Sequence, residues 1–283
     1  MRQRPDFPLP LLHYLGRKVK AVRSRASSGL LSFAHTSRGG NKPLFFSGFI
    51  FIKLQYNLFV CSQFFKPRNY LSLEFTSCLS RCRRLLEAGC GHGCSLIPLL
   101  SIKREDSEEG LTFYASDYCS EALDILRRRL SDEDASRFRG ISVWDITSPP
   151  PANIAAFRPD AILCIFTLSA VHPKHHLQSL RHLASLLAPG GHLLFRDYGI
   201  ADMTMYRHEV CLEPLLMQRA DKTLAYYFST EYLRELISQV PSLAVEELKY
   251  ARVLLKNRKK DSTSRRVFVH AVFRRTDFVA DPT

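Results

Sequence analysis

The stretch that decides the fold is "RRLLEAGCGHGCSLIPLL", at Arg83–Leu100. It begins as an apolar strand, breaks at Gly89, Gly91 and Gly93, and resumes as an apolar helix. Glycines in such a turn allow positive φ angles and let the backbone approach a ligand closely, because no Cβ intrudes. The spacing is neither a P-loop nor the dinucleotide fingerprint G-x-G-x-x-G, since position 94 is Cys. The alternative is a tight strand–helix turn without a ligand.

From this turn onward, strand and helix patterns alternate. The expected strands are Arg84–Ala88, Leu111–Ser116, Ile141–Asp145, Ala161–Thr167, His192–Asp197, Val245–Leu255 and Arg265–Arg274. The expected helices are Cys94–Ile102, Ser120–Leu130, His175–Leu187 and Thr230–Ser238. Such alternation predicts parallel strands with right-handed crossovers. Because only the basic turn "KNRKKDSTSRR" separates the last two strands, we predict an α/β fold whose seven-stranded, mostly parallel sheet ends in a C-terminal antiparallel hairpin.

Two aspartates follow neighbouring strands of this predicted sheet. Asp117 ends the second strand, where an acid can accept hydrogen bonds from a ribose diol. Asp145 ends the third strand, where it can accept the amine of an adenine while Ile146 packs on the ring. Either aspartate alone could instead be a helix N-cap. Together they favour an adenosyl ligand, and the absence of a phosphate-binding pattern favours S-adenosylmethionine.

The charge of the chain is concentrated at its two ends. The net charge is +13 over 283 residues. Residues 1–40 hold eight Lys and Arg against one Asp, a net +7, and residues 249–275 hold ten against one, a net +9. The rest therefore sums to −3. Basic ends on a slightly acidic middle predict a polyanionic partner, most simply nucleic acid, with a solvated surface as the alternative.

Other features limit the class of protein. We expect two parts, a basic and poorly ordered N-terminal extension at 1–62 and one domain at 63–283. The stretch "PLFFSGFIFI" (43–52) is too short to span a bilayer, so no membrane partner is expected. The eight cysteines show no zinc-binding spacing, which predicts no metal site and reduced thiols. We expect a cytoplasmic or nuclear protein, but the Arg-rich start also resembles a mitochondrial transit peptide.

Five blocks carry a resemblance to a known family. They are "FFKPRNYL", "LLEAGCGHGCSLIPLL", "ASDYCSEAL", "CIFTLSAVHPKHHLQSLRHLASLLAPGGHLLFRDYG" and "ADKTLAYYFSTEYL", in this order. The chain resembles the methyltransferase-like family that makes 3-methylcytidine in tRNA anticodon loops, over about Phe64–Arg274. It departs from the family at Cys94, where members usually have Asn, and at Ala220–Lys222, where they have "DGT". It also has no upstream Trp, and Tyr56 stands near the place of a family Tyr.

The resemblance implies a class I methyltransferase with a Rossmann-like fold. Its cofactor is S-adenosylmethionine, and its partner is tRNA, with an aminoacyl-tRNA synthetase or other accessory protein as a further partner. The cofactor contacts that we expect are Glu87, Gly89, Gly91, Gly93, Asp117, Tyr118, Asp145, Ile146 and Ile165.

The chemistry suggests where catalytic residues lie. Methyl transfer from a sulfonium is a displacement that depends on alignment, and N3 of cytidine needs no strong base. The product is a cation, so Asp197 in "FRDYG" could stabilise the developing charge, with Arg196 orienting it or binding a phosphate. Tyr198 could stack on an unpaired base. In "SAVHP", Ser169 and His172 could meet the base edge or a phosphate.

Structural alternatives exist for these residues. Arg196 and Asp197 could form an internal salt bridge, and His172 could cap the helix that follows it. His175 and His176 are expected on the surface, residues 226–228 in a packed strand, and Lys256–Lys260 either in a solvated turn or on tRNA phosphates. Two rival functions also remain: a class I methyltransferase acting on protein or a small molecule, and a catalytically impaired RNA-binding homologue.

Overall fold

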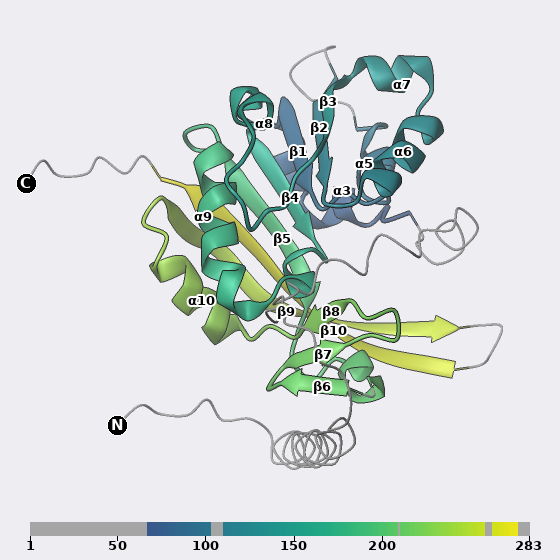
Figure 1. Ribbon diagram of the computed structural model, residues 1–283, viewed down its shortest axis with the longest axis vertical. Helices are drawn as coiled ribbons and strands as arrows, with labels where there is room; N and C mark the ends of the chain where they lie inside the picture. Colours follow the sequence, from purple (N-terminus) through teal and green to yellow (C-terminus); the bar gives the residue numbers. More distant parts are fainter. Residues whose placement is uncertain (1–66, 103–109, 209, 258–261, 277–283) are drawn as a thin grey trace, which may run out of the picture.

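The computed structural model describes residues 67–102, 110–208, 210–257 and 262–276. A seven-stranded sheet with the order β3-β2-β1-β4-β5-β10-β9 forms its centre (Figure 1). The strands are β1 (Arg84–Ala88), β2 (Thr112–Asp117), β3 (Phe138–Val143), β4 (Ala161–Ile165), β5 (His192–Tyr198), β9 (Leu243–Asn257) and β10 (Ser262–Arg275). Strands β1 to β5 pair in parallel, whereas β10 pairs antiparallel with both β5 and β9. The predicted fold class and C-terminal hairpin are therefore confirmed.

Helices cover both faces of the sheet, which explains why its central strands β1, β4 and β5 are almost entirely buried. One face packs against α8 (Ala152–Phe157), α9 (His176–Leu186) and α10 (Thr230–Ser238). The other packs against α3 (Leu71–Glu74), α4 (Thr76–Leu79), α5 (Leu96–Leu99) and α6 (Ser120–Arg129). The sequence of crossovers leaves the carboxyl ends of β1, β2 and β4 at one edge, where open α/β sheets bind ligands.

A second, three-stranded antiparallel sheet was not predicted. It consists of β6 (Val210–Glu213), β7 (Leu216–Gln218) and β8 (Leu224–Tyr226) and lies beside the carboxyl end of β5 (Figure 1). The second residue after β8 fixes this position, because the Phe228 amide donates to the Tyr198 carbonyl at 2.8 Å. Strands of three or four residues are too short to show a period of two, so hydrophobic periodicity could not reveal them.

The β9–β10 hairpin extends beyond the main sheet. Strand β10 pairs with β5 only from Phe268 to Arg274, whereas its pairing with β9 continues to Ser262. Residues 252–257 and 262–267 thus form a two-stranded ribbon that projects next to β6–β8 (Figure 1). Of the expected tip Lys256–Lys260, residues 258–260 lie outside the described part of the chain.

Several predicted boundaries were wrong. The helix expected at Cys94–Ile102 is only α5, because the segment contains Pro98, which has no N–H for the helical hydrogen bond, and starts in the glycine turn. The third strand ends at Val143, two residues before Asp145. Helices α7 (Asp132–Ser136) and α8 were missed because each is under two turns long. The predicted division at residue 62 lies outside the described residues and stays a prediction.

Among the described residues, no helix is long and apolar enough to span a membrane. The seven described cysteines form no disulfide, and within the same ranges no cluster of three or more His, Cys, Asp or Glu is placed to hold a metal ion.

Candidate active site

The glycine turn after β1 is held against the end of β2. The amides of Gly89 and Cys90 both donate to the Ser116 carbonyl, at 2.8 and 3.0 Å. Gly89, at φ +76°, has no room for a side chain, because an added Cβ would lie 2.3 Å from the Thr167 side chain. Gly91, at φ +54°, differs, since a Cβ there would meet nothing within 4 Å. The turn is therefore closely packed at Gly89 and leaves open space at Gly91.

Asp117 connects the turn to the end of β2. Its carboxylate accepts hydrogen bonds from the Gly91 amide at 2.7 Å and from the Cys119 amide at 2.8 Å. Burial raises the pKa of Asp117, and these two amide donors act in the opposite direction. The next residue, Tyr118, is exposed. Asp117 thus lies at the predicted edge and holds the open part of the glycine turn.

The other predicted cofactor residues gather at neighbouring strand ends. Asp145 accepts from the Thr147 amide at 2.9 Å and from its hydroxyl at 2.8 Å, so it also closes a local turn. Ile146 and Ile165 are buried, at 5% and 1% exposure, and pack in the core. Gly93 has no room for a side chain either, because a Cβ would lie 2.5 Å from Leu126. These three residues are therefore part of the packed core beside the site, and the cofactor contacts predicted for Gly93, Ile146 and Ile165 stay predictions.

Glu87 is a buried charged group of the site that has one long ion-pair contact, to Arg68, and no hydrogen bond within the described part of the chain. Its side chain is fully buried on β1, and neither carboxylate oxygen has a hydrogen-bond partner among the described residues. Burial raises its pKa to about 7, although the Arg68 guanidinium, 4.0 Å away, favours the charged form. A buried carboxylate without a donor is costly. The open space at Gly91 and this acceptor fit a ligand that carries a cationic group, as the methionine part of S-adenosylmethionine does.

Asp197 lies at the end of β5 and is fully buried. Its carboxylate accepts from the Ser169 amide at 2.9 Å and from the Tyr198 amide at 2.8 Å. Burial raises its pKa to about 6, while these two amide donors favour the ionised form. The bond to Ser169 fixes the short 3-10 helix Leu168–Ala170 that follows β4. The structure thus brings together two of the predicted catalytic residues, Asp197 and Ser169.

The predicted role of Arg196 in orienting Asp197 is wrong. Successive strand residues point to opposite faces of a sheet, so Arg196 cannot orient Asp197. Its guanidinium forms an ion pair with Glu74 of α3 and lies 4.5 Å from the Phe268 ring centroid. Arg196 is only 6% exposed, and its predicted contact with a phosphate stays a prediction. The alternative of a salt bridge with Asp197 is also wrong.

Tyr198 lies in an aromatic cluster that the sequence did not reveal. Its ring centroid is 5.0 Å from that of Phe166 and 5.6 Å from that of Tyr227, and the Arg219 guanidinium lies 5.4 Å away. Phe166 has a φ of +55°, which is strained for a bulky residue and typical of functional sites. The half-buried ring of Tyr198 is therefore largely occupied by neighbours, and its stacking on a base stays a prediction.

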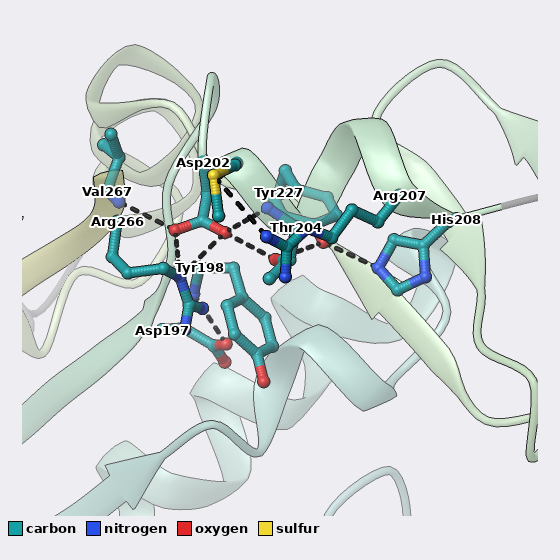
Figure 2. A network of polar contacts seen from close by, with 10 residues as sticks. Asp197, Tyr198, Asp202, Thr204, Arg207, His208, Tyr227, Arg266 and Val267 are labelled. Atoms are coloured by element: carbon teal, nitrogen blue, oxygen red, sulfur yellow. Dashed lines mark hydrogen bonds and ion pairs between the residues drawn. The ribbon is translucent and has the colours of Figure 1, made fainter. Parts of the chain in front are cut away.

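A hydrogen-bond network fixes the loop after Tyr198 (Figure 2). Buried Asp202 pairs with Arg266 at 2.9 Å and accepts from the Val267 amide at 2.7 Å, which joins the loop to β10. Asp202 also accepts from the Thr204 amide at 2.8 Å, and the Thr204 hydroxyl lies 3.0 Å from that of Tyr227. The network therefore joins the loop after Tyr198 to β10 and to Tyr227.

The histidines after β4 have structural roles. The His172 Nδ1 atom accepts from the Lys174 amide at 3.3 Å, so the capping alternative is confirmed, and its Nε2 lies 3.5 Å from Glu213. His176 was expected on the surface but is fully buried, and burial lowers its pKa to about 4. It bonds to the Val171 carbonyl at 3.0 Å. Residues 226–228 are buried, as the packed-strand interpretation predicted.

Comparisons with known proteins agree with this geometry. A family model described as "Methyltransferase domain" matches residues 47–240. The tRNA(Thr) (cytosine(32)-N(3))-methyltransferase of Saccharomyces cerevisiae is 32% identical over 221 residues, which cover 74% of this chain and 34% of that protein. The tRNA N(3)-cytidine methyltransferase METTL6 of Mus musculus is 32% identical over 236 residues, which cover 78% of this chain and 79% of that protein.

One solved structure covers nearly the whole length. It is the 1,6-didemethyltoxoflavin-N1-methyltransferase of Burkholderia thailandensis with bound 1,6-didemethyltoxoflavin and S-adenosylhomocysteine, with a TM-score of 0.50, 16% identity and coverage of 98% of this chain and 94% of that chain. At this identity the likeness concerns the fold alone. This chain spans about a third of the yeast relative's length and about four fifths of the mouse relative's.

Proposed function

The chain belongs to the family of tRNA N3-cytidine methyltransferases, and on that premise we propose that it transfers a methyl group from S-adenosylmethionine to N3 of a cytidine in the anticodon loop of tRNA. The observation that carries the proposal is the identity to the mouse tRNA methyltransferase over most of both chains. The open glycine turn, the buried Glu87 carboxylate that makes no hydrogen bond to the described residues, and buried Asp197 at one edge of the sheet support it.

Residues at the ends of β1 and β2 would hold the cofactor. The Gly91 backbone faces the space left for it, and Asp117 would accept from the ribose hydroxyls while it keeps the turn in place. Glu87 would accept from the ammonium group of the methionine part. S-adenosylmethionine, when bound, supplies an electrophilic methyl group on a sulfonium.

Residues at the ends of β4 and β5 would serve the transfer. N3 of cytidine has its own lone pair, so the site has to align the base rather than remove a proton. The Asp197 charge, held in a buried position by the Ser169 and Tyr198 amides, would stabilise the positive charge that develops on the ring. Ser169 would contribute through the backbone that follows β4. His172 is placed as a helix cap with one face toward Glu213, and we assign it no chemical step.

The test uses the purified full chain with unmodified tRNA transcripts and S-adenosylmethionine. Nucleoside mass spectrometry of the product should show 3-methylcytidine, and calorimetry should show cofactor binding. Methyl transfer to protein or a small molecule, with tRNA left unmodified, would favour the first rival function. Binding of tRNA without cofactor binding would favour an impaired RNA-binding homologue.

We also propose that the chain works with an aminoacyl-tRNA synthetase or another accessory protein, in the cytoplasm or nucleus. The family resemblance motivates the first proposal, and the Arg-rich start makes mitochondria the alternative location. Cells would be separated into cytoplasmic, nuclear and mitochondrial fractions, and the chain would be purified from each. The proteins that purify with it test the first proposal, and the fraction that contains it tests the second. Recovery of the chain in mitochondria alone would contradict the proposed location.

A further inference from the structure

Arg219 differs from the other arginines around the aromatic cluster at Tyr198. Arg196 pairs with Glu74, Arg266 pairs with Asp202 at 2.9 Å, and Arg68 lies 4.0 Å from Glu87. Arg219 has no carboxylate within 4.0 Å in the described ranges. Its guanidinium lies 5.4 Å from the Tyr198 ring centroid and makes one long hydrogen bond, 3.4 Å, to the Thr223 hydroxyl. A half-buried cation thus faces the site without an ion-pair partner among these residues.

The turn between β7 and β8 holds Arg219 in place. The Arg219 amide donates to the Thr223 carbonyl at 2.8 Å, and the Lys222 amide donates to the Arg219 carbonyl at 2.9 Å. The adjacent acid, Asp221, is used inside the turn, where it accepts from the Thr223 amide at 3.0 Å and from its hydroxyl at 2.6 Å. The turn therefore presents the guanidinium over Tyr198 and supplies no anion for it.

The missing ion-pair partner indicates what Arg219 binds. The planar guanidinium donates two parallel hydrogen bonds to an oxyanion, and stacking on an aromatic ring fixes its plane beforehand. Tyr198 directly follows Asp197, so an anion bound here would lie next to the proposed reaction centre. Resting on the proposed function, we propose that Arg219 is a substrate-positioning residue that binds a phosphate flanking the target cytidine and so sets the register of the base beside Asp197.

The first arm of the test measures binding. The full chain and its variants Arg219→Ala, Arg219→Lys and Arg139→Ala are titrated with unmodified tRNA. Arg139 is a matched control, because it is an exposed arginine near the start of β3, at the opposite edge of the sheet. Arg219→Ala should weaken tRNA binding about 10- to 100-fold, as expected when a hydrogen bond to a charged group is removed. Arg219→Lys should restore part of the affinity, and Arg139→Ala should match the wild type.

The second arm locates the bound phosphate. Two tRNAs carry an uncharged methylphosphonate, one on the 5′ side and one on the 3′ side of the target cytidine. If Arg219 binds one of these linkages, the wild type should bind the tRNA with a methylphosphonate there more weakly than unmodified tRNA. Arg219→Ala, which has already lost this contact, should bind the two tRNAs equally. The proposal would be overturned if, at both linkages, the methylphosphonate weakened tRNA binding as much in Arg219→Ala as in the wild type. It would also be overturned if Arg219→Ala weakened S-adenosylmethionine binding as much as tRNA binding. Neither arm needs turnover, so a wild type that makes no 3-methylcytidine would refute the proposed function while the binding data still decide on Arg219.

Discussion

Gly89 and Gly91 lie two residues apart in one turn, yet alanine should fail at each for a different reason. At Gly89 the new Cβ would lie 2.3 Å from Thr167, so Gly89→Ala should lower the melting temperature strongly. At Gly91 the Cβ would meet nothing within 4 Å, so Gly91→Ala should cost only about 1 kcal/mol for its positive φ. Its Cβ would instead enter the ligand space and abolish cofactor binding in calorimetry. Adding Thr167→Gly should restore the stability of Gly89→Ala but should not restore cofactor binding to Gly91→Ala. A Gly91→Ala variant that folds and still binds the cofactor would contradict the placement of the ligand at Gly91.

Glu87 makes cofactor affinity depend on pH. Its pKa is about 7 because of burial, and only the ionised form can bind a cation well. Affinity for S-adenosylmethionine should therefore rise as pH increases through about 7, up to about pH 8, where the ligand's own α-amino group begins to lose its proton. The raised pKa has the opposite effect on stability. The folded state holds the Glu87 proton more tightly than the unfolded state does, so the free energy of unfolding should fall as pH rises toward 7. Calorimetry below and above this range should show the dependence in the wild type and not in Glu87→Gln. An equal slope in both would remove Glu87 from the site.

At the scale of elements, α3 is fastened to the sheet by one carboxylate. Glu74 pairs with Arg196 of β5 and bonds to Nδ1 of His270 of β10 at 2.8 Å, while Phe75 stacks on the His270 ring. Burial would raise the pKa of Glu74, but His270 and Arg196 hold it below its usual value. Glu74→Ala leaves Arg196 buried without a partner and should cost about 3–5 kcal/mol.

This contribution should vanish in acid. Because the folded pKa of Glu74 is lowered, its stabilisation is complete above the unfolded pKa and is lost as pH falls through the folded one. Urea unfolding of wild type and Glu74→Ala should therefore converge as the pH is lowered below about 4. A difference that stays constant with pH would show that α3 is held by packing instead.

The same elements show how far the sequence alone could go. The buried strand β4 is a continuous apolar run, and β1 has an apolar pair, Leu85–Leu86, just before the glycine turn, so both could be identified. The aspartates at strand ends followed from chain order, because parallel strands end at one edge. Arg196 and Arg219 could not be placed this way. The partner of Arg196 is 122 residues away in sequence, and Arg219 lies in a turn between two strands that are too short to predict.

At the scale of the whole molecule, we expect tRNA to contact a basic surface on the projecting ribbon, which is distinct from the strand ends that would hold the cofactor. On the projecting ribbon, Arg252 pairs in register with Val267 and Arg265 with Leu254, which places the two exposed arginines on one face. Neither has a carboxylate within 4.0 Å among the described residues, so this face can follow a phosphate backbone.

The double variant Arg252→Glu, Arg265→Glu should therefore weaken tRNA binding and flatten its salt dependence. Each phosphate that the protein no longer neutralises reduces the slope of log affinity against log salt by about 0.7–0.9, so the change should approach twice that value. Cofactor affinity should not change, because the ribbon lies away from β1 and β2 (Figure 1). Arg139→Glu, with the same kind of charge reversal at the opposite edge, is the control for net charge. If the double variant flattens the slope only about twice as much as Arg139→Glu, in proportion to the charge removed, the effect belongs to the overall charge of +13 and the ribbon makes no specific contact.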